Sequence, residues 1–330
     1  MEKKKVGIVC GGFTSEYKIS LQSGQTVFNH LDTSLWEGYL IKLQSDNWTA
    51  KDKNGISYFV SKGDFTLIKN EEKIHLDVVF NAIHGAPGEN GQLAALWELL
   101  AIPFTSCSSY TAALTYNKRD CLSVLRDLKV PTALHYALDK KDSIDLKAIE
   151  KTVGFPCFVK ANRAGSSFGV YKVYNPEALE KAIQEAFHED SQLLIENALI
   201  GREVSVGVAS LKGKTTVFPV TEIISENDFF DYAAKYEGQS QEITPAKIPA
   251  LWLEQLKKWS EIIYNRLEFR GVVRSEFIFV EGIPHLLEIN TVPGMTARSI
   301  IPQQVVVMGM DLKEFFTLLL EEALTFNQNT

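Results

Sequence analysis

The stretch that decides the fold is EINTVPGMTARS at residues 288–299, which follows directly on SEFIFVEGIPHLL at residues 275–287. Two apolar runs flank Glu281-Gly282, a pair typical of a tight turn. The stretch therefore predicts an antiparallel hairpin whose second strand ends before Pro293-Gly294. The flanking FIFV and HLLEI indicate that the hairpin belongs to a core sheet.

Three oxygen-bearing side chains gather at one end of this hairpin. Glu288 and Asn290 are two residues apart, so they point to the same face of the strand. Counting back from the turn places Glu276 opposite Leu287 or Glu288. Two carboxylates and an amide suit Mg²⁺, which keeps waters and completes its shell with nucleotide phosphates. The alternative is a solvated polar edge, but the core character of the strands favours a metal site.

Length and composition describe an ordinary globular chain. Its 330 residues give room for two or three domains. The net charge is −7 and no basic run exceeds KKK at residues 3–5, so we expect no nucleic-acid binding. No window approaches 18 apolar residues, so we expect no membrane span. The four cysteines show no C-x-x-C spacing, which favours reduced thiols and a cytoplasmic protein.

The first hundred residues show strand, loop and helix in series. KVGIVCGG at residues 5–12 and LDVVFNAIHG at residues 76–85 are typical of buried parallel strands, and leucines with helical spacing follow from Leu93. This pattern predicts a parallel α/β sheet.

From about residue 108 the predicted strands and helices alternate less regularly. Residues 225–249 are polar, with little apolar periodicity, and predict a functional lid or a disordered insert. We expect an N-terminal α/β domain at residues 1–107, a small central domain at 108–196 and a C-terminal domain at 197–330.

Two glycine-rich segments are candidates for phosphate binding. GVASLKGKT at residues 207–215 looks like a Walker A loop, but five residues separate its glycines where that loop has four. Gly213 is therefore predicted at a hairpin turn. VKANRAGSSFGV at residues 159–170 is the better candidate, because such a loop exposes backbone N–H groups and Lys160 supplies a point charge. A glycine–serine hairpin turn remains the alternative for this loop.

The hairpin, the glycine-rich loop and several further segments occur in the same order as in the D-alanine–D-alanine ligase family of the ATP-grasp superfamily, which the chain resembles. RSEFIF and LLEINTVPGMTARS resemble its metal-binding end, and FVKANRAGSSFGV its glycine-rich loop. GGFTSEYKIS resembles its first glycine turn, and HGAPGENG the second loop of its first domain. LIENALIGREVSV resembles the adenine and ribose contacts, YNK supplies a lysine, and DYAAKY resembles the start of a mobile omega loop. The match covers nearly the whole chain.

This resemblance implies an α/β, three-domain ATP-grasp fold with a Rossmann-like N-terminal parallel-sheet domain. ATP would lie between the second and third domains, and D-alanine where the first meets the third. The family joins two D-alanines: the carboxylate of the first attacks the γ-phosphate, and the amine of the second displaces phosphate from the acylphosphate. The resemblance also implies two Mg²⁺ ions (Mn²⁺ possible), a homodimer through the first domain, and a cytoplasmic role in peptidoglycan synthesis.

The resemblance assigns nucleotide and metal contacts to individual residues. Nucleotide contacts fall on Lys118, Lys160, Ser167, Glu196, Asn197, Leu199, Glu203 and Lys235. Metal ligands are Glu276, Glu288 and Asn290.

The resemblance assigns the remaining roles to residues that act on the amino acids. Arg274 and the Gly294 N–H would form an oxyanion hole. Glu16 would bind the first ammonium group and Ser299 the second carboxylate. Ser166 and Tyr236 would form a hydrogen-bonded group with Glu16 that couples lid closure to substrate binding, and His84 would join the substrate contacts.

Four positions depart from the family's pattern. Glu276 stands where an aspartate is usual, and its longer side chain should still reach a metal. Thr14 replaces a serine, Asn117 an aspartate, and Phe168 a smaller aliphatic residue. None of these changes removes a catalytic group.

Two other functions stay open. A related ligase would take D-serine or D-lactate as acceptor; Tyr236 disfavours D-lactate, because in the family tyrosine at this position accompanies an amine acceptor, but it leaves D-serine. The second open function is that of a non-catalytic, ATP-binding regulatory module. Lys235, Arg274 and Ser299 argue against it, because nucleotide binding alone would not need them.

Overall fold

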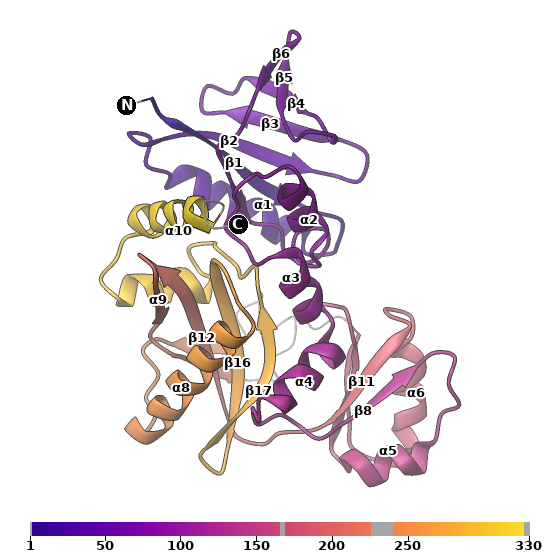
Figure 1. Cartoon of the computed structure of the whole chain (residues 1–330). Coiled ribbons are helices and arrows are strands. Elements are labelled where there is room, and N and C mark those ends of the chain that lie inside the picture. Colours follow the sequence, from indigo (N-terminus) through magenta and orange to yellow (C-terminus); the bar gives the residue numbers. More distant parts are fainter. Residues whose placement is uncertain (1, 166–168, 226–239, 327–330) are drawn as a thin grey trace.

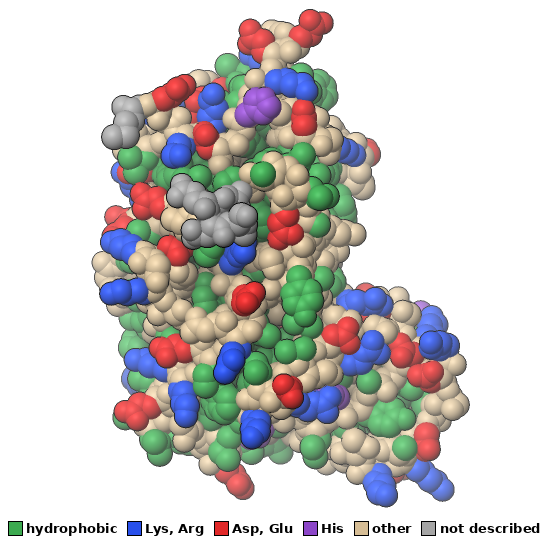
Figure 2. Space-filling view, viewed as in Figure 1, with side chains coloured by type: hydrophobic (Ala, Val, Ile, Leu, Met, Phe, Trp, Pro, Cys, Tyr) green, Lys and Arg blue, Asp and Glu red, His purple; other side chains and the backbone are tan. Residues whose placement is uncertain are grey.

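The computed structural model describes residues 2–165, 169–225 and 240–326, and in these ranges the chain forms three β-sheets with flanking helices (Figure 1). Figure 2 shows acidic and basic side chains interspersed over one face of the molecule. No helix in the described ranges is long and apolar enough to cross a membrane.

The first sheet is mixed. Its parallel part is β1 (Lys4–Gly11) between β2 (Trp36–Leu43) and β7 (Val78–Asn81), with α1 (Tyr17–Asn29) and α2 (Gln92–Leu99) beside it. The expected parallel pairing is confirmed for these strands. Short antiparallel strands, which the sequence reasoning did not predict, extend the sheet beyond β2: β3 (Trp48–Asp52), β4 (Ser57–Val60), β5 (Leu67–Lys69) and β6 (Glu72–Ile74).

A small antiparallel sheet follows, reached through α3 (Ser109–Tyr116) and α4 (Lys118–Asp127). Its helix α6 (Pro176–Ala186) begins where sequence rules place it, because the Asn175 side chain accepts a hydrogen bond from the Ala178 N–H and Pro176 lies in the first turn. Figure 2 shows this part as a lobe projecting from the body. Its elements are β8 (His135–Asp139), α5 (Leu146–Val153), β9 (Cys157–Ala161), β10 (Val170–Val173), α6 (Pro176–Ala186) and β11 (Gln192–Asn197), with strand order β10-β9-β11-β8.

The third sheet has the strand order β15 (Ser240–Ile243), β14 (Thr221–Ser225), β12 (Arg202–Leu211), β16 (Val272–Val280) and β17 (Ile283–Asn290), and β13 (Lys214–Val217) pairs with β12. Gly213, with φ +73°, lies in the β12–β13 turn as predicted. Ser240–Ile243 forms the edge strand β15, so this part of the segment expected to be irregular at 225–249 is regular; residues 226–239 lie outside the described ranges. The helices of this part of the chain are α8 (Ala250–Arg266), α9 (Ile300–Val307) and α10 (Leu312–Phe326).

The first and third sheets share one hydrophobic core. Helix α10 lies against the first sheet (Figure 1), and its Phe316 ring contacts Phe80 of β7 edge-to-face at 5.6 Å. The same cluster includes Val6 and Ile8 of β1 and Ala209 of β12. We propose that the chain has three domains, and that the first domain (residues 1–107) and the third (residues 197–330) pack together through this shared core.

Gly271, just before β16, is predicted to be a position that only glycine tolerates. Its φ is +64°, and a Cβ there would lie 1.7 Å from the Thr105 carbonyl oxygen. We expect Gly271→Ala to lower the free energy of unfolding by about 3 kcal/mol, because the left-handed backbone costs ~1–2 kcal/mol and the clash adds to it. Gly213→Ala, at φ +73° with nothing within 4 Å, is the control and should cost about 1 kcal/mol. Equal losses in guanidinium unfolding would contradict the steric argument.

Candidate active site

The β16–β17 hairpin lies between two cavities. Across the strands Glu276 pairs with Glu288, one of the two partners predicted for it, and Arg274 pairs with Asn290. Glu276 and Glu288 line a cavity of about 440 Å³. Arg274 and Asn290 line a second cavity of about 280 Å³. The predicted metal ligands therefore stand at the boundary between the two.

The larger cavity opens between the small sheet and the third sheet. Its walls come from β9, β10, the segment before β12, β14 and the hairpin. Its volume lies within the range of small-molecule sites. Four residues predicted to bind the nucleotide line it: Lys118, Lys160, Leu199 and Glu203.

Lys160 is held by a buried ion pair. Its Nζ lies 2.6 Å from Glu196 Oε2, and the two side chains are 12% and 4% exposed. The pair joins neighbouring strands β9 and β11. Asn197 is also engaged, because its Oδ1 accepts a hydrogen bond from the Leu134 N–H at 2.7 Å. Glu196 and Asn197 thus support the wall of the cavity, while Leu199 lies on it.

Lys118 is the first residue of α4, where the helix dipole disfavours a cation. Its Nζ donates to the Ala164 carbonyl at 2.6 Å, next to the glycine-rich loop. Asn117 caps α4 and accepts a hydrogen bond from Asn162 Nδ2 at 2.8 Å. An amide oxygen therefore serves here as a carboxylate oxygen would, so this departure from the family leaves the helix start intact.

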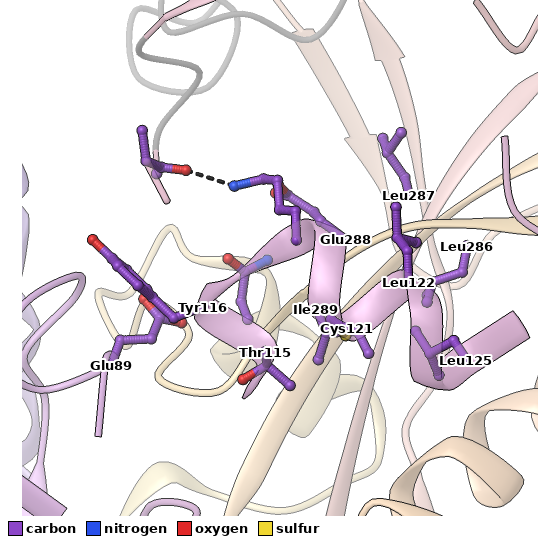
Figure 3. Close-up of a pocket in the computed structure, with 14 residues that line it drawn as sticks. Glu89, Thr115, Tyr116, Cys121, Leu122, Leu125, Leu286, Leu287, Glu288 and Ile289 are labelled. Carbon is purple, nitrogen blue, oxygen red and sulfur yellow. Dashed lines mark hydrogen bonds between the residues drawn. The ribbon is translucent and has the colours of Figure 1, made fainter. Parts of the chain in front are cut away.

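A third pocket of about 40 Å³ lies between α4 and β17. Figure 3 shows Glu89 and Tyr116 at one end of it and Leu122, Leu125 and Leu286 at the other. It is large enough for water. Glu89 also lines the 280 Å³ cavity, and Glu288 the 440 Å³ one, so this pocket lies where the two approach.

Glu16 lies at the wall of the smaller cavity. It occupies the N-cap position of α1, yet its side chain makes no capping hydrogen bond. A Cβ at Gly85 or Gly165 would lie 2.9 or 2.7 Å from Glu16 Oε2, so both glycines leave room for the carboxylate. Glu16 thus lies beside Gly165, and the next residue along the chain is its predicted partner Ser166. Four predicted residues lie outside the described ranges: Ser166, Ser167, Lys235 and Tyr236.

Gly294 and Ser299 lie together on the far wall of the same cavity. A Cβ at Gly294 would be 2.7 Å from Ser299 Oγ. That hydroxyl also accepts a hydrogen bond from the Thr296 N–H at 3.1 Å, which fixes it at the start of α9. A backbone N–H and a hydroxyl, the two groups predicted to contact substrate here, are therefore held side by side.

His84 supports this wall from behind. Its Nδ1 lies 2.7 Å from the Val292 carbonyl, which can only accept, so Nδ1 carries the proton. Nε2 then accepts from the Ser23 hydroxyl at 2.9 Å, and Ser23 Oγ accepts from the Met295 N–H at 3.1 Å. Burial lowers the pKa of His84, which keeps the ring neutral. This relay fixes the backbone on both sides of Gly294, a role that the sequence did not predict.

Glu89 was missed by the sequence reasoning, although it lies in the quoted HGAPGENG loop. Its carboxylate accepts hydrogen bonds from the N–H groups of Gly85, Thr291 and Val292 at 3.1, 3.0 and 3.3 Å. It therefore joins the first sheet's loop to the end of the hairpin beside Asn290. The sequence offered no sign of this contact, because the partners lie about two hundred residues apart.

The pH dependence of stability is predicted to report on Glu89. Burial, with a smaller contribution from Glu16, raises the pKa of Glu89 to about 7. The unfolded chain has a pKa of about 4.3 for this group, so between these pH values the folded state holds a proton that the unfolded state releases. The free energy of unfolding should therefore fall as pH rises through this window, by about 4 kcal/mol from this group, and level off above it. Denaturant unfolding between pH 4.5 and 8 should show a flatter profile for Glu89→Gln than for the wild type or an exposed control, Glu72→Gln. Identical slopes would contradict the prediction.

The residues at the cavity boundary fit a divalent cation. Two carboxylates, from Glu276 and Glu288, face each other across the strands, and Asn290 follows two residues after Glu288 on the same strand. One guanidinium, from Arg274, contacts Glu276 Oε1 at 2.7 Å. No group of three or more His, Cys, Asp or Glu side chains suited to a metal occurs among the described residues. The remaining ligands would thus come from phosphate and water, as is usual for Mg²⁺.

Comparisons with known proteins agree over the whole chain. The family models described as D-ala D-ala ligase N-terminus and C-terminus match residues 5–107 and 124–321. A D-alanine–D-alanine ligase of Flavobacterium johnsoniae is 48% identical over 321 residues, which cover 97% of this chain and 99% of that protein. The structure of D-alanyl-alanine synthetase A from Vibrio cholerae has a TM-score of 0.88 at 28% identity, covering 99% and 100% of the two chains. VanG D-Ala:D-Ser ligase from Enterococcus faecalis has a TM-score of 0.85 at 26% identity, covering 99% and 100%. The expected α/β ATP-grasp fold is thereby confirmed.

Proposed function

The chain belongs to the D-alanine–D-alanine ligase family, and from this we propose that it joins two D-alanines through D-alanyl phosphate, with ATP as the energy source, for peptidoglycan synthesis. The observation that carries the proposal is the meeting of two cavities at the β16–β17 hairpin. One has the size of a nucleotide site, and the other is lined by opposite charges, as two zwitterionic amino acids require. The site residues, the domain boundaries, a homodimer and a cytoplasmic location are parts of the proposal.

The first step needs a carboxylate and a γ-phosphate brought together, both negatively charged. We assign Lys118 and Lys160 to the nucleotide phosphates and Glu16 to the ammonium group of the first D-alanine. The carboxylate attacks the γ-phosphorus, the bond to the β-phosphate oxygen breaks, and ADP leaves. Such a transfer depends on positioning and charge neutralisation rather than on covalent chemistry by the protein.

The second step forms the peptide bond. The ammonium group of the second D-alanine first loses a proton to solvent, and the resulting amine attacks the acylphosphate carbonyl. The C–O bond to phosphate breaks, and the departing phosphate can take the second proton from the nitrogen. The developing oxyanion would be stabilised by Arg274 and the Gly294 N–H, and the second carboxylate would be bound by Ser299. Glu89, His84 and Ser23 fix the backbone that carries these groups, through the hydrogen bonds already described.

In our proposal the site holds two Mg²⁺ ions, which Mn²⁺ can replace. The protein ligands would be Glu276, Glu288 and Asn290. When bound, the metal neutralises phosphate charge. Because Glu276 is almost completely buried and contacts Arg274, its position links the metal ligands to the proposed oxyanion hole.

The test is phosphate release from ATP and Mg²⁺ in five parallel reactions, with products separated by mass. The reactions contain no acceptor, D-alanine, L-alanine, D-alanine with D-lactate, and D-alanine with D-serine. We expect release only where D-alanine is present, with the mass of D-alanyl-D-alanine. A mixed dipeptide with D-serine as the main product would favour the acceptor named for the VanG neighbour. Folded, ATP-binding protein without D-alanine-dependent release would contradict the ligase function and favour a regulatory module.

A further inference from the structure

We propose that Glu242 binds the ammonium group of the second D-alanine and thereby selects an amino acid over a hydroxy acid as acceptor. This inference deepens the proposed function and rests on it. Glu242 lies in the segment that the sequence predicted to be an irregular lid, and no role was predicted for it.

The structure places Glu242 on the edge strand β15, where it lines the 280 Å³ cavity together with Arg274, Gly294 and Ser299. Its Cα pairs with Ile223 of β14, so the third sheet fixes its backbone. Its Oε2 accepts a hydrogen bond from Gln303 Nε2 at 2.8 Å. A carboxylate offers about four acceptor positions, so this bond orients Glu242 and leaves capacity for a ligand.

Gln303 places this carboxylate close to the proposed site for the second carboxylate group. The same Nε2 also donates to the Arg298 carbonyl at 2.8 Å, and Arg298 directly precedes Ser299. Glu242 Oε2 and the Arg298 oxygen are thus separated by no more than two hydrogen-bond lengths. An α-amino acid carries its ammonium and carboxylate groups on one carbon, so its binding groups of opposite character must lie close together. Glu242 and Ser299 line the same cavity, and Gln303 ties Glu242 to the residue before Ser299.

The other carboxyl groups of the cavity are engaged elsewhere. Glu89 accepts three backbone N–H bonds. Glu16 lies against Gly85 and Gly165, on the wall formed by the first sheet's loop and the glycine-rich loop. Glu242 comes from the opposite wall, next to α9. Two carboxylates on separate walls match the two ammonium groups that the reaction brings in.

The electrostatic surroundings of Glu242 agree with a cationic ligand. Burial raises the pKa of Glu242, and the Gln303 hydrogen bond and the charge of Arg274 only partly oppose that rise. The carboxylate is therefore incompletely compensated by the protein, and an ammonium group would compensate it. A hydroxy acid brings a neutral hydroxyl in place of the ammonium, so it would leave the charge of this half-buried carboxylate without a cation.

The test is Glu242→Gln, which keeps the shape of the side chain and removes its charge. We expect the KM for acceptor D-alanine to rise about 10-fold or more, because the charge-assisted hydrogen bond to its ammonium group is lost. The ratio of kcat/KM for D-alanine over D-lactate as acceptor should fall by a similar factor. Trapping of D-alanyl phosphate by hydroxylamine, which reports the first step alone, should stay within about twofold of the wild type.

Two further variants keep the test decisive. Glu254→Gln removes an exposed charge on α8 and should change none of these values. Gln303→Leu keeps the Glu242 charge but frees its orientation, and it should raise the same KM even if Glu242→Gln folds poorly. An unchanged acceptor KM and acceptor ratio in both variants, with normal wild-type turnover, would overturn the inference and leave the ligase function intact. Wild-type protein without D-alanine-dependent phosphate release would overturn the ligase function, and with it the inference.

Discussion

Arg274→Lys is expected to lower kcat for phosphate release by about 10²–10³-fold, the loss typical of removing one oxyanion-hole donor. Arg274 stands at the end of the hairpin, lining the amino-acid cavity, and its Nη2 donates to Glu276 Oε1 at 2.7 Å. Lysine keeps the positive charge but lacks the rigid fork of donors, so it cannot contact the carboxylate and a developing oxyanion in one fixed geometry. The loss should therefore fall on turnover rather than on folding.

The choice of lysine matters because Glu276 is only 1% exposed. Arg274→Ala would remove the guanidinium that contacts this buried carboxylate, and the protein could unfold as a result. A loss of activity in that variant could then not be separated from a loss of folded protein. Melting temperature and the KM for ATP should stay near the wild-type values in Arg274→Lys. Arg266→Lys, at the exposed end of α8, is the matched control. A kcat within about threefold of the wild type would contradict the assignment of Arg274 to the oxyanion hole.

The register of the β16–β17 hairpin could be predicted from sequence only in part. A turn at Glu281-Gly282 pairs Phe277 with Leu286, and the same count continued without interruption would set Glu276 opposite Leu287, so the sequence left Leu287 and Glu288 both open. A β-bulge between Glu276 and Phe277, which was not predicted, shifts the register by one residue and sets Glu276 opposite Glu288.

Contacts between distant segments could not be predicted in this way. The Lys160–Glu196 pair depends on β9 lying beside β11, an order that alternation along one strand does not encode. Glu89 and its partners Thr291 and Val292 meet only because the first sheet packs against the hairpin. The resemblance to a known family supplied roles for Lys160 and Glu196 but not the bond between them.

Short strands with weak periodicity were also missed. The four antiparallel strands between residues 48 and 74 are three to five residues long and lie toward one edge of the sheet. Strand β15 has four residues and follows a polar segment, so low hydrophobicity alone suggested a loop. For that reason Glu242, which this strand presents to the amino-acid cavity, could be found only in the structure.

Lys160→Met is expected to remove ATP binding and to destabilise the fold at the same time. Methionine fills a similar volume but leaves Glu196, which is 4% exposed, without its cation. Breaking one partner of a buried ion pair costs about 3–5 kcal/mol, because the remaining charge stays buried. The loss of a charged phosphate contact should raise the Kd for ATP by about 10- to 100-fold. Guanidinium unfolding and calorimetric titration with ATP and Mg²⁺ measure the two effects separately.

The double variant Lys160→Met with Glu196→Gln separates stability from binding. It replaces the ion pair by neutral groups of similar size, so most of the lost free energy of unfolding should return. ATP binding should not return, because the phosphate contact requires the ammonium group of Lys160. If the double variant is as unstable as Lys160→Met, the instability does not come from a stranded Glu196 charge. If it binds ATP as tightly as the wild type, Lys160 serves the fold of the small sheet and not the nucleotide.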